Sequence, residues 1–328
     1  AMTDEKNKLP YRQAYEAEQI DLINVFMQIW RGKVIVALFV VLCLVIAGIY
    51  LAFAKEKWTS VAVISAPDAG QIVNYTSAMS IVSNDNRFDI TGIQERVIGR
   101  FNSAFSALSE TLDNQDVPEK LTIDTAVQGQ PLPLKVTYQG ASAKYAQQKL
   151  AEYIEQIDQL IAKELVSDLD INIKARADNL LESLTTQERV AQEQKDLRIK
   201  QIMQALTVAK ESKVEAPQIQ QTENVSQDTM FLLGSAALDS MIKNESSRPL
   251  IFTDDYYKTR KNLLDLQTIE VKPDTIHSYR YVMKPSLPVH RDSPRIALVM
   301  ILALLLGTMI GSGVVLMRNA VRSYQPKA

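Results

Sequence analysis

Two long apolar runs near the ends of the chain dominate its pattern of hydrophobic and polar positions. Val34–Ala54 has 21 residues and Ile296–Met317 has 22, and neither run contains a charged residue. A helix needs ~20 residues to cross a bilayer core of ~30 Å, whereas buried helices of soluble domains are usually shorter. The pattern predicts two transmembrane helices, 34–54 and 296–317, with residues 55–295 forming one large domain between them.

The first run does not have the pattern of a cleaved signal peptide. It begins only at Val34, is longer than the apolar region of a typical leader, and is followed by Lys55-Glu56-Lys57. Basic residues near the two spans are almost equally numerous on both sides, but the short segment 318–328 contains basic residues and no acid. Because short positive segments stay in the cytoplasm, we expect 1–33 and 318–328 to be cytoplasmic and 55–295 to be periplasmic.

Short β-branched or alternating segments in the domain predict strands. They are Trp58–Ser65, Lys120–Val127, Leu134–Tyr138 and Ser278–Met283. Gly129-Gln130-Pro131 predicts the turn between the second and the third. These strands come from both ends of the domain, so we expect them to meet near the membrane.

A long region without glycine or proline, Ala141–Ala216, carries apolar residues at helical spacing. We expect the polar cluster Ser167–Asp170 to divide it into two helices, the second of which (roughly 169–215) would still reach ~70 Å. Met230–Ile242 and Asp254–Gln267 predict shorter helices.

The middle of the long helical region, Thr185–Asp196, is almost entirely polar and cannot pack deeply into the core of one chain. Such a helix is either a solvated projection supported by charge pairs or a surface that meets other copies of the chain. We favour contacts between copies, because helices gain most of their stability from packing. The candidate contact residues are Gln187, Val190, Ala191, Gln194 and Leu197.

The second apolar run contains a G-x-x-x-G motif at Gly307 and Gly311, with Gly313 close by. Small residues on one face allow transmembrane helices to approach closely, although glycine is also common in membrane spans by chance. We expect the three glycines to serve helix packing.

A proline-rich segment, Lys284–Arg295, precedes the second span. Its prolines, Pro285, Pro288 and Pro294, restrict the backbone and predict a stiff, extended connector between the domain and the membrane.

Composition argues against catalysis. With 36 basic and 38 acidic residues, the chain has no excess of positive charge for binding nucleic acid. Cys43 is the single cysteine, and His277 and His290 have no accompanying metal-binding pattern. Asp254-Asp255 is better interpreted as the start of a helix than as an acid pair. We expect no catalytic residue, no metal and no cofactor.

Longer stretches of the chain resemble one known family. They are Glu18–Lys33, Ala54–Ser60, Arg100–Gln115, Val190–Ile202, Gln227–Lys243 and Arg280–Arg295. From about residue 18 to its end, the chain is similar to the Wzz chain-length determinants, the class 1 polysaccharide co-polymerases, and above all to those that regulate O-antigen. Such long stretches are far more specific than a short motif.

The resemblance implies an α+β membrane protein of the bacterial inner membrane, with a membrane-proximal α/β base and a long helix that projects into the periplasm. It implies a bell-shaped ring of identical copies, typically an octamer. It also implies that the protein, without catalytic residues, sets the modal length of lipopolysaccharide O-antigen. The partners implied are the Wzy polymerase and the polysaccharide on its undecaprenyl pyrophosphate carrier, within membrane lipid and without nucleic acid.

Other protein classes also have two spans around a periplasmic domain. A receptor needs a cytoplasmic output module and a tyrosine-kinase co-polymerase needs nucleotide motifs after the second span, and residues 318–328 hold neither. A periplasmic adaptor or scaffold of another envelope export system fits the architecture and remains the alternative.

Overall fold

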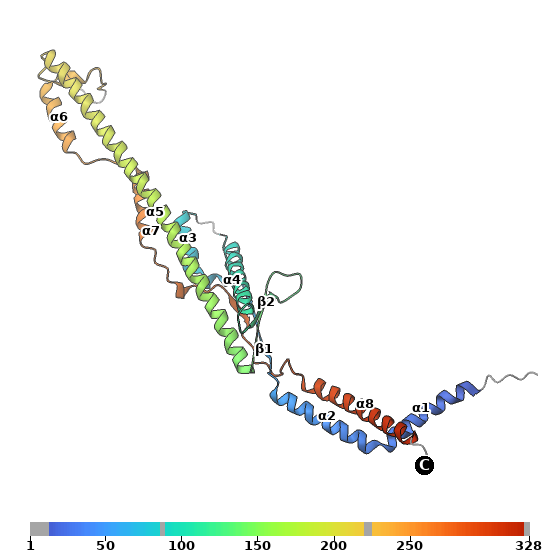
Figure 1. Ribbon diagram of the computed structural model, residues 1–328. Coiled ribbons are helices and arrows are strands. Elements are labelled where there is room, and N and C mark those ends of the chain that lie inside the picture. Colours follow the sequence, from blue (N-terminus) through green and yellow to red (C-terminus); the bar gives the residue numbers. More distant parts are fainter. Residues whose placement is uncertain (1–12, 86–88, 220–224, 325–328) are drawn as a thin grey trace, which may run out of the picture. The chain divides into compact units, whose positions relative to one another are not determined.

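The computed structural model describes residues 13–85, 89–219 and 225–324 (Figure 1). Parts of the two expected cytoplasmic segments, residues 1–12 and 325–328, lie outside the described residues. The chain divides into two compact units, each built from separate stretches of sequence. The first combines residues 1–64, 105–154 and 281–328, and the second combines 65–104 and 155–280.

The first unit contains a four-stranded sheet with strand order β2-β3-β1-β4. The strands are β1 Trp58–Ser65, β2 Lys120–Thr125, β3 Leu134–Gly140 and β4 Arg280–Met283. Strand β3 runs antiparallel to both β1 and β2. All four predicted strands are confirmed, although β2 ends two residues earlier and β4 begins two residues later than predicted.

One face of this sheet is buried because alternate residues of a strand point to the same side. Ala62 and Ile64 in β1, and Val136 in β3, are fully buried, and Ala62 pairs directly with Val136. Ser60 lies on the same side of β1 and is also fully buried. A buried hydroxyl needs a hydrogen-bond partner, and Ser60 finds one in the proline-rich connector.

The long helical region forms a single helix, α5 Ala143–Glu211, which spans about 100 Å. The predicted break at 167–170 is therefore wrong (Figure 1). Leu169 is fully buried against other helices, and the Asp168 carboxylate pairs with the Arg100 guanidinium at 2.8 Å. These tertiary contacts stabilise the helix where local sequence predicted its end.

Three α-helices were not predicted: α1 Gln13–Arg31, before the first span, and α3 Val73–Ser83 and α4 Ile90–Asp113, in the domain between the spans. Apolar residues in α4 recur every four positions, at Ile93, Val97, Phe101 and Phe105, and all are buried. This spacing is typical of a helix that packs one face.

The second unit also contains α6 Ser235–Ser247 and α7 Asp254–Gln267. Helix α7 has the predicted bounds. The predicted helix 230–242 is instead a 3-10 turn, Met230–Leu233, followed by α6, because Gly234 between them has a positive φ of 91°. One hydrophobic cluster joins α3, α5 and α7, and another joins the end of α5 to α6.

Three helices of the first unit lie outside the sheet: α1 Gln13–Arg31, α2 Lys33–Phe53 and α8 Ile296–Ser323. In the described chain, α2 and α8 are the helices long and apolar enough to cross a membrane. They coincide with the two predicted spans, and α8 continues beyond Met317 through Ser323.

Candidate functional site

Helices α2 and α8 pack side by side, and two of the predicted packing glycines lie at their contact (Figure 1). A Cβ atom on Gly307 would lie 2.6 Å from the Cα of Val40, and one on Gly311 would lie 2.8 Å from the Cα of Val36. The two backbones thus approach too closely for a side chain at either glycine. A Cβ on Gly313 would meet no atom of a neighbouring element within 4 Å in the described chain.

The contact follows one face of α8. The buried residues Ala303, Gly307, Gly311 and Val315 are spaced four apart, so they form a single stripe. At the end of this stripe, a Cβ on Gly32 would lie 2.6 Å from both methyl groups of Val315. At both glycines of the motif, the backbone of α8 therefore lies directly against the backbone of α2 in the same chain.

The proline-rich connector is tied to the sheet rather than free. The Ser60 hydroxyl donates to the Ser286 carbonyl at 2.6 Å, and the Val61 N–H donates to the Ser286 hydroxyl at 3.0 Å. The Ser286 N–H in turn donates to the Val61 carbonyl at 2.9 Å. The connector thus continues the pairing of β4 with β1.

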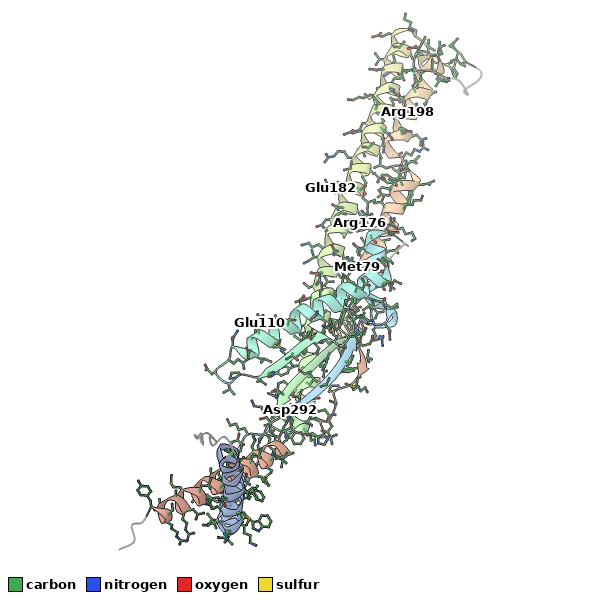
Figure 2. All side chains as sticks on the ribbon, turned by 90° about the vertical axis from the view of Figure 1, so that its right-hand side faces the viewer. Met79, Glu110, Arg176, Glu182, Arg198 and Asp292 are labelled. Carbon is green, nitrogen blue, oxygen red and sulfur yellow. The ribbon has the colours of Figure 1, made fainter. Side chains whose placement is uncertain are left out.

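The same pairing extends to the end of the connector. The Lys57 N–H donates to the Ser293 carbonyl at 2.9 Å, and the Asp292 N–H donates to the Lys57 carbonyl at 2.7 Å. Arg291 donates to Glu56 at 2.9 Å, and the Thr59 hydroxyl donates to the Asp292 carboxylate, which Figure 2 labels. We call residues 56–61 and 285–293 together the membrane-proximal seam.

The three connector prolines lie within or beside this seam. The Pro285 carbonyl accepts a hydrogen bond from the Gln147 amide at 3.1 Å. Pro288 is partly buried and Pro294 is buried. Connector geometry is therefore held by hydrogen bonds as well as by the restricted proline backbone.

The polar middle of α5 is partly covered by the segment of the same chain that joins α6 to α7. Ala191 and Gln194 line a shallow pocket with residues 248–251, and the Lys195 ammonium donates to the Ser246 and Arg248 carbonyls. Gln187 is partly buried, whereas Val190 and Leu197 remain exposed by 45% and 56%. Of the five predicted contact residues, Gln187 and Ala191 are therefore partly covered within the chain, whereas Val190, Gln194 and Leu197 are exposed.

A buried carboxylate that sequence analysis missed lies in the second unit. Asp158 accepts hydrogen bonds from the Ser278 N–H and hydroxyl, both at 2.7 Å, and its other oxygen lies 3.0 Å from Nδ1 of His277. Its hydrogen-bond partners are about 120 residues away in sequence, so the local sequence pattern around Asp158 could not predict them. Asp254 and Asp255 occupy the first turn of α7, as interpreted from the sequence.

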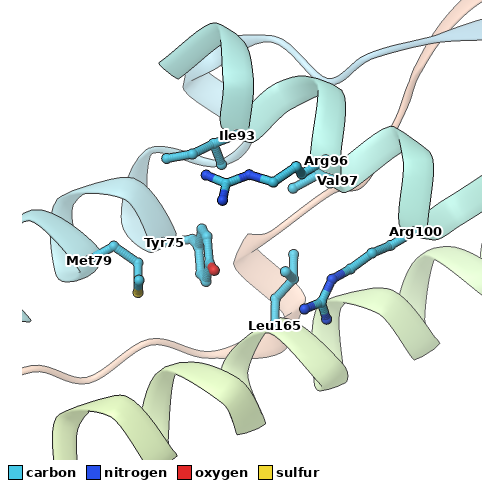
Figure 3. Close-up of a pocket in the computed structure, with 7 residues that line it drawn as sticks. All are labelled: Tyr75, Met79, Ile93, Arg96, Val97, Arg100 and Leu165. Atoms are coloured by element: carbon cyan, nitrogen blue, oxygen red, sulfur yellow. The ribbon is translucent and has the colours of Figure 1, made fainter. Parts of the chain in front are cut away.

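A pocket between α3, α4 and α5 combines cationic and apolar side chains (Figure 3). Its lining residues are Tyr75, Met79, Ile93, Arg96, Val97, Arg100 and Leu165. Burial raises the pKa of the Tyr75 phenol, and the Arg100 guanidinium partly opposes that shift. The Arg100 guanidinium is already paired with the Asp168 carboxylate at 2.8 Å, and the lining residues contain no pair of nucleophile and base. The described chain also has no cluster of three or more potential metal ligands.

Comparison with known proteins gives one consistent result. A family model described as "Chain length determinant protein" (Wzz) matches residues 18–125. The chain length determinant protein of Escherichia coli O111:H- is 55% identical over 96% of this chain and 97% of its own length. That of Salmonella typhimurium is 56% identical over 95% of this chain and 96% of its own length.

Solved structures of the same family match this chain as well. A full-length bacterial polysaccharide co-polymerase has 54% identity and a TM-score of 0.76, and the match covers 93% of this chain and 99% of that one. The O-antigen chain-length regulator WzzB of Shigella flexneri has 56% identity and a TM-score of 0.63 over 71% of this chain and 100% of that one. A Wzz dodecamer has 57% identity and a TM-score of 0.59, and covers 72% and 100%.

Proposed function

This chain belongs to the chain length determinant (Wzz) family, and on that premise we propose that it sets the modal length of lipopolysaccharide O-antigen. The observation that carries the proposal is that more than half of the aligned residues, over nearly the whole chain, are identical to those of chain length determinant proteins. The protein is a two-span protein of the inner membrane with a periplasmic domain. The proposal places 1–33 and 318–328 in the cytoplasm, because the second of these segments is basic.

We infer that the protein acts without chemistry of its own, on O-antigen that the Wzy polymerase extends on undecaprenyl pyrophosphate. A regulator that is not an enzyme can act only by holding a polymerase or a growing chain in a defined geometry. The close packing of α2 on α8 and the hydrogen-bonded seam support this idea. They fix the membrane helices to the sheet, which gives a docked polymerase a constant position relative to that sheet.

We propose that identical copies form a ring. The open face of α5, with Val190 and Leu197 exposed, supports contacts between copies. The resemblance led us to expect an octamer, but one solved Wzz structure that matches this chain is a dodecamer. We therefore propose a dodecamer in place of the octamer.

The test is a deletion strain examined by lipopolysaccharide gel electrophoresis. We expect loss of the protein to replace a ladder with a preferred length by an unregulated distribution dominated by short chains, and expect the full chain to restore the preferred length. An unchanged ladder together with a defect in another envelope component would contradict this function. That outcome would instead favour an adaptor or scaffold of another export system.

A further inference from the structure

Helix α1, which precedes the first span, has an apolar face that the described chain leaves open. Leu22, Ile23, Phe26, Met27 and Trp30 each have between 52% and 73% of their surface exposed. Their spacing of one, four, five and eight residues places all five on one side of an α-helix. The opposite side carries Asn24, Gln28 and Arg31.

The chain bends between α1 and α2 (Figure 1). The bend is at Gly32, where φ of −90° and ψ of 16° interrupt the helix. Val315 of α8 packs against this glycine so closely that a Cβ there would lie 2.6 Å from its methyl groups. The bend is therefore a packed feature of the hairpin.

The bend lies at the edge of the membrane core. Val315 is three residues, or ~4.5 Å of helix, before Arg318, the first charged residue after the second span. On the other side of the helical hairpin, Arg31 at the end of α1 and Lys33 at the start of α2 flank the bend. The end of α1 at this bend is therefore level with the boundary between charged groups and hydrocarbon. Trp30 lies beside the bend, and tryptophan is enriched at that boundary.

We propose that α1 lies in the plane of the membrane surface, with its apolar face buried at the boundary between lipid headgroups and acyl chains. Two observations favour lipid over a second copy of the chain. The apolar face ends at the bend that leads into a membrane-spanning helix, and the opposite side is polar, with Asp21, Asn24, Gln28 and Arg31 at helical spacing. This surface anchors the hairpin on the side of the termini and restricts its rotation in the bilayer.

Burial of apolar surface, rather than charge, holds α1 at the membrane. Its sequence carries Glu16, Glu18 and Asp21 against Arg31, so attraction to anionic headgroups is weak. The proposal therefore requires that α1 lie on the surface of uncharged phosphatidylcholine bilayers as well as on that of anionic ones.

Tryptophan fluorescence of the full chain tests the proposal, because the chain has only two tryptophans. Trp58→Phe leaves Trp30 as the sole reporter, and the protein is reconstituted in phosphatidylcholine vesicles. The vesicles carry bromine either near the headgroup or near the ends of the acyl chains. We expect blue-shifted emission and stronger quenching by the shallow bromine atoms than by the deep ones.

The matched control moves the reporter to the polar face of the same helix. In a chain with Trp30→Phe and Trp58→Phe, Gln28→Trp should be quenched several-fold less by bromolipid and more by aqueous iodide. Equal quenching at both positions would overturn the proposal. If Trp58→Phe disturbs folding, the loss of quenching caused by Trp30→Phe in the otherwise unchanged chain measures the same quantity.

A second copy as the occupant of this face gives a different result. Trp30 would then be protected from iodide and untouched by either bromolipid, and Phe26→Cys combined with Cys43→Ala would cross-link copies efficiently. That combination would also overturn the proposal. Neither outcome depends on O-antigen length, so this test of α1 is independent of the test of the proposed function.

Discussion

Gly307 of α8 faces the backbone of Val40 in α2 so closely that a Cβ on the glycine would lie 2.6 Å from the Val40 Cα atom. A backbone atom cannot rotate away as a side chain can. The contact therefore requires glycine, or a change in the separation of the two helices.

We expect Gly307→Leu to destabilise the hairpin by about 1–3 kcal/mol or more, the usual cost of overpacking. Gly313→Leu is the matched control, since a Cβ at Gly313 meets no neighbouring element of the described chain within 4 Å. Thermal unfolding of the full protein in mild detergent measures the difference. Equal losses at the two glycines would show that close approach at Gly307 does not matter.

Loosening the membrane-proximal seam should change O-antigen length without unfolding the domain. Ser286→Ala combined with Asp292→Ala removes the side-chain hydrogen bonds to Val61 and Thr59. We expect a broadened or shifted preferred length on lipopolysaccharide gels. Leu287→Ala, at an exposed position of the same connector, is the control and should leave the length unchanged.

The connector prolines provide a second test of the same idea. Replacing Pro285, Pro288 and Pro294 together by serine raises backbone freedom. We expect a weaker effect on length than from the loss of both side-chain bonds, because the backbone hydrogen bonds of Lys57 and Val61 remain. If the triple proline variant changes O-antigen length more than the Ser286→Ala and Asp292→Ala variant does, the stiffness of the prolines matters more than the side-chain hydrogen bonds.

Asp158→Ala should destabilise the second unit by roughly 2–4 kcal/mol, because it leaves the buried Ser278 N–H and hydroxyl without their acceptor. Asp158→Asn keeps one carbonyl acceptor and should cost less. Chemical denaturation in detergent compares the two variants. Similar values for both would mean that the charge of Asp158, rather than its accepting geometry, provides the stability.

The open face of α5 should control assembly. Val190→Glu with Leu197→Glu places two carboxylates on the face proposed to meet other copies, so we expect a smaller oligomer by mass measurement in detergent. Gln192→Glu with Asp196→Lys changes charges on the other side of α5 and should leave the mass unchanged. An intact ring in the first variant would remove this face from the proposed interface.

Alkaline pH should weaken the base of the first unit. Glu119 accepts hydrogen bonds from the phenols of Tyr138 and Tyr153 at 2.7 and 2.9 Å. Burial, and then the hydrogen bond to this carboxylate, raises the pKa of both phenols above the ordinary value. Their stabilising effect is complete below the unfolded pKa of about 10 and is lost as pH rises above it.

We therefore expect the free energy of unfolding to fall above about pH 10, and to fall less steeply in Tyr153→Phe. Denaturation midpoints measured across this pH range provide the comparison. The same slope in the variant and the parent chain would show that Tyr153 does not contribute to the alkaline loss.

Local patterns were sufficient for the elements whose environment is uniform along their length. The spans 34–54 and 296–317 were predicted because lipid surrounds most of each helix, so nearly every position is apolar. The alternation in Trp58–Ser65 and Leu134–Tyr138 likewise predicted strands, because one side of the sheet is buried. The long helix followed from the lack of glycine and proline over 141–216.

The same patterns failed where distant residues decide the structure. The predicted break at 167–170 does not occur, because Leu169 is fully buried against α3 and α7, and α3 is a helix that the sequence analysis did not predict. The G-x-x-x-G motif predicted that α8 packs closely against another helix, but it did not predict which one. In the structure, Gly307 and Gly311 face α2 of the same chain.

The sequence by itself thus determined two spans, a mixed domain, a long helix and, through its resemblance, the family. Only the tertiary structure decided which surfaces remain for partners, because each pairing joins residues far apart in the chain. Ser60 binds Ser286, Asp158 binds Ser278, and Ala191 is covered while Val190 beside it stays open. The physical reason is that periodicity reports how much of a residue is buried, whereas its partner depends on how the whole chain packs.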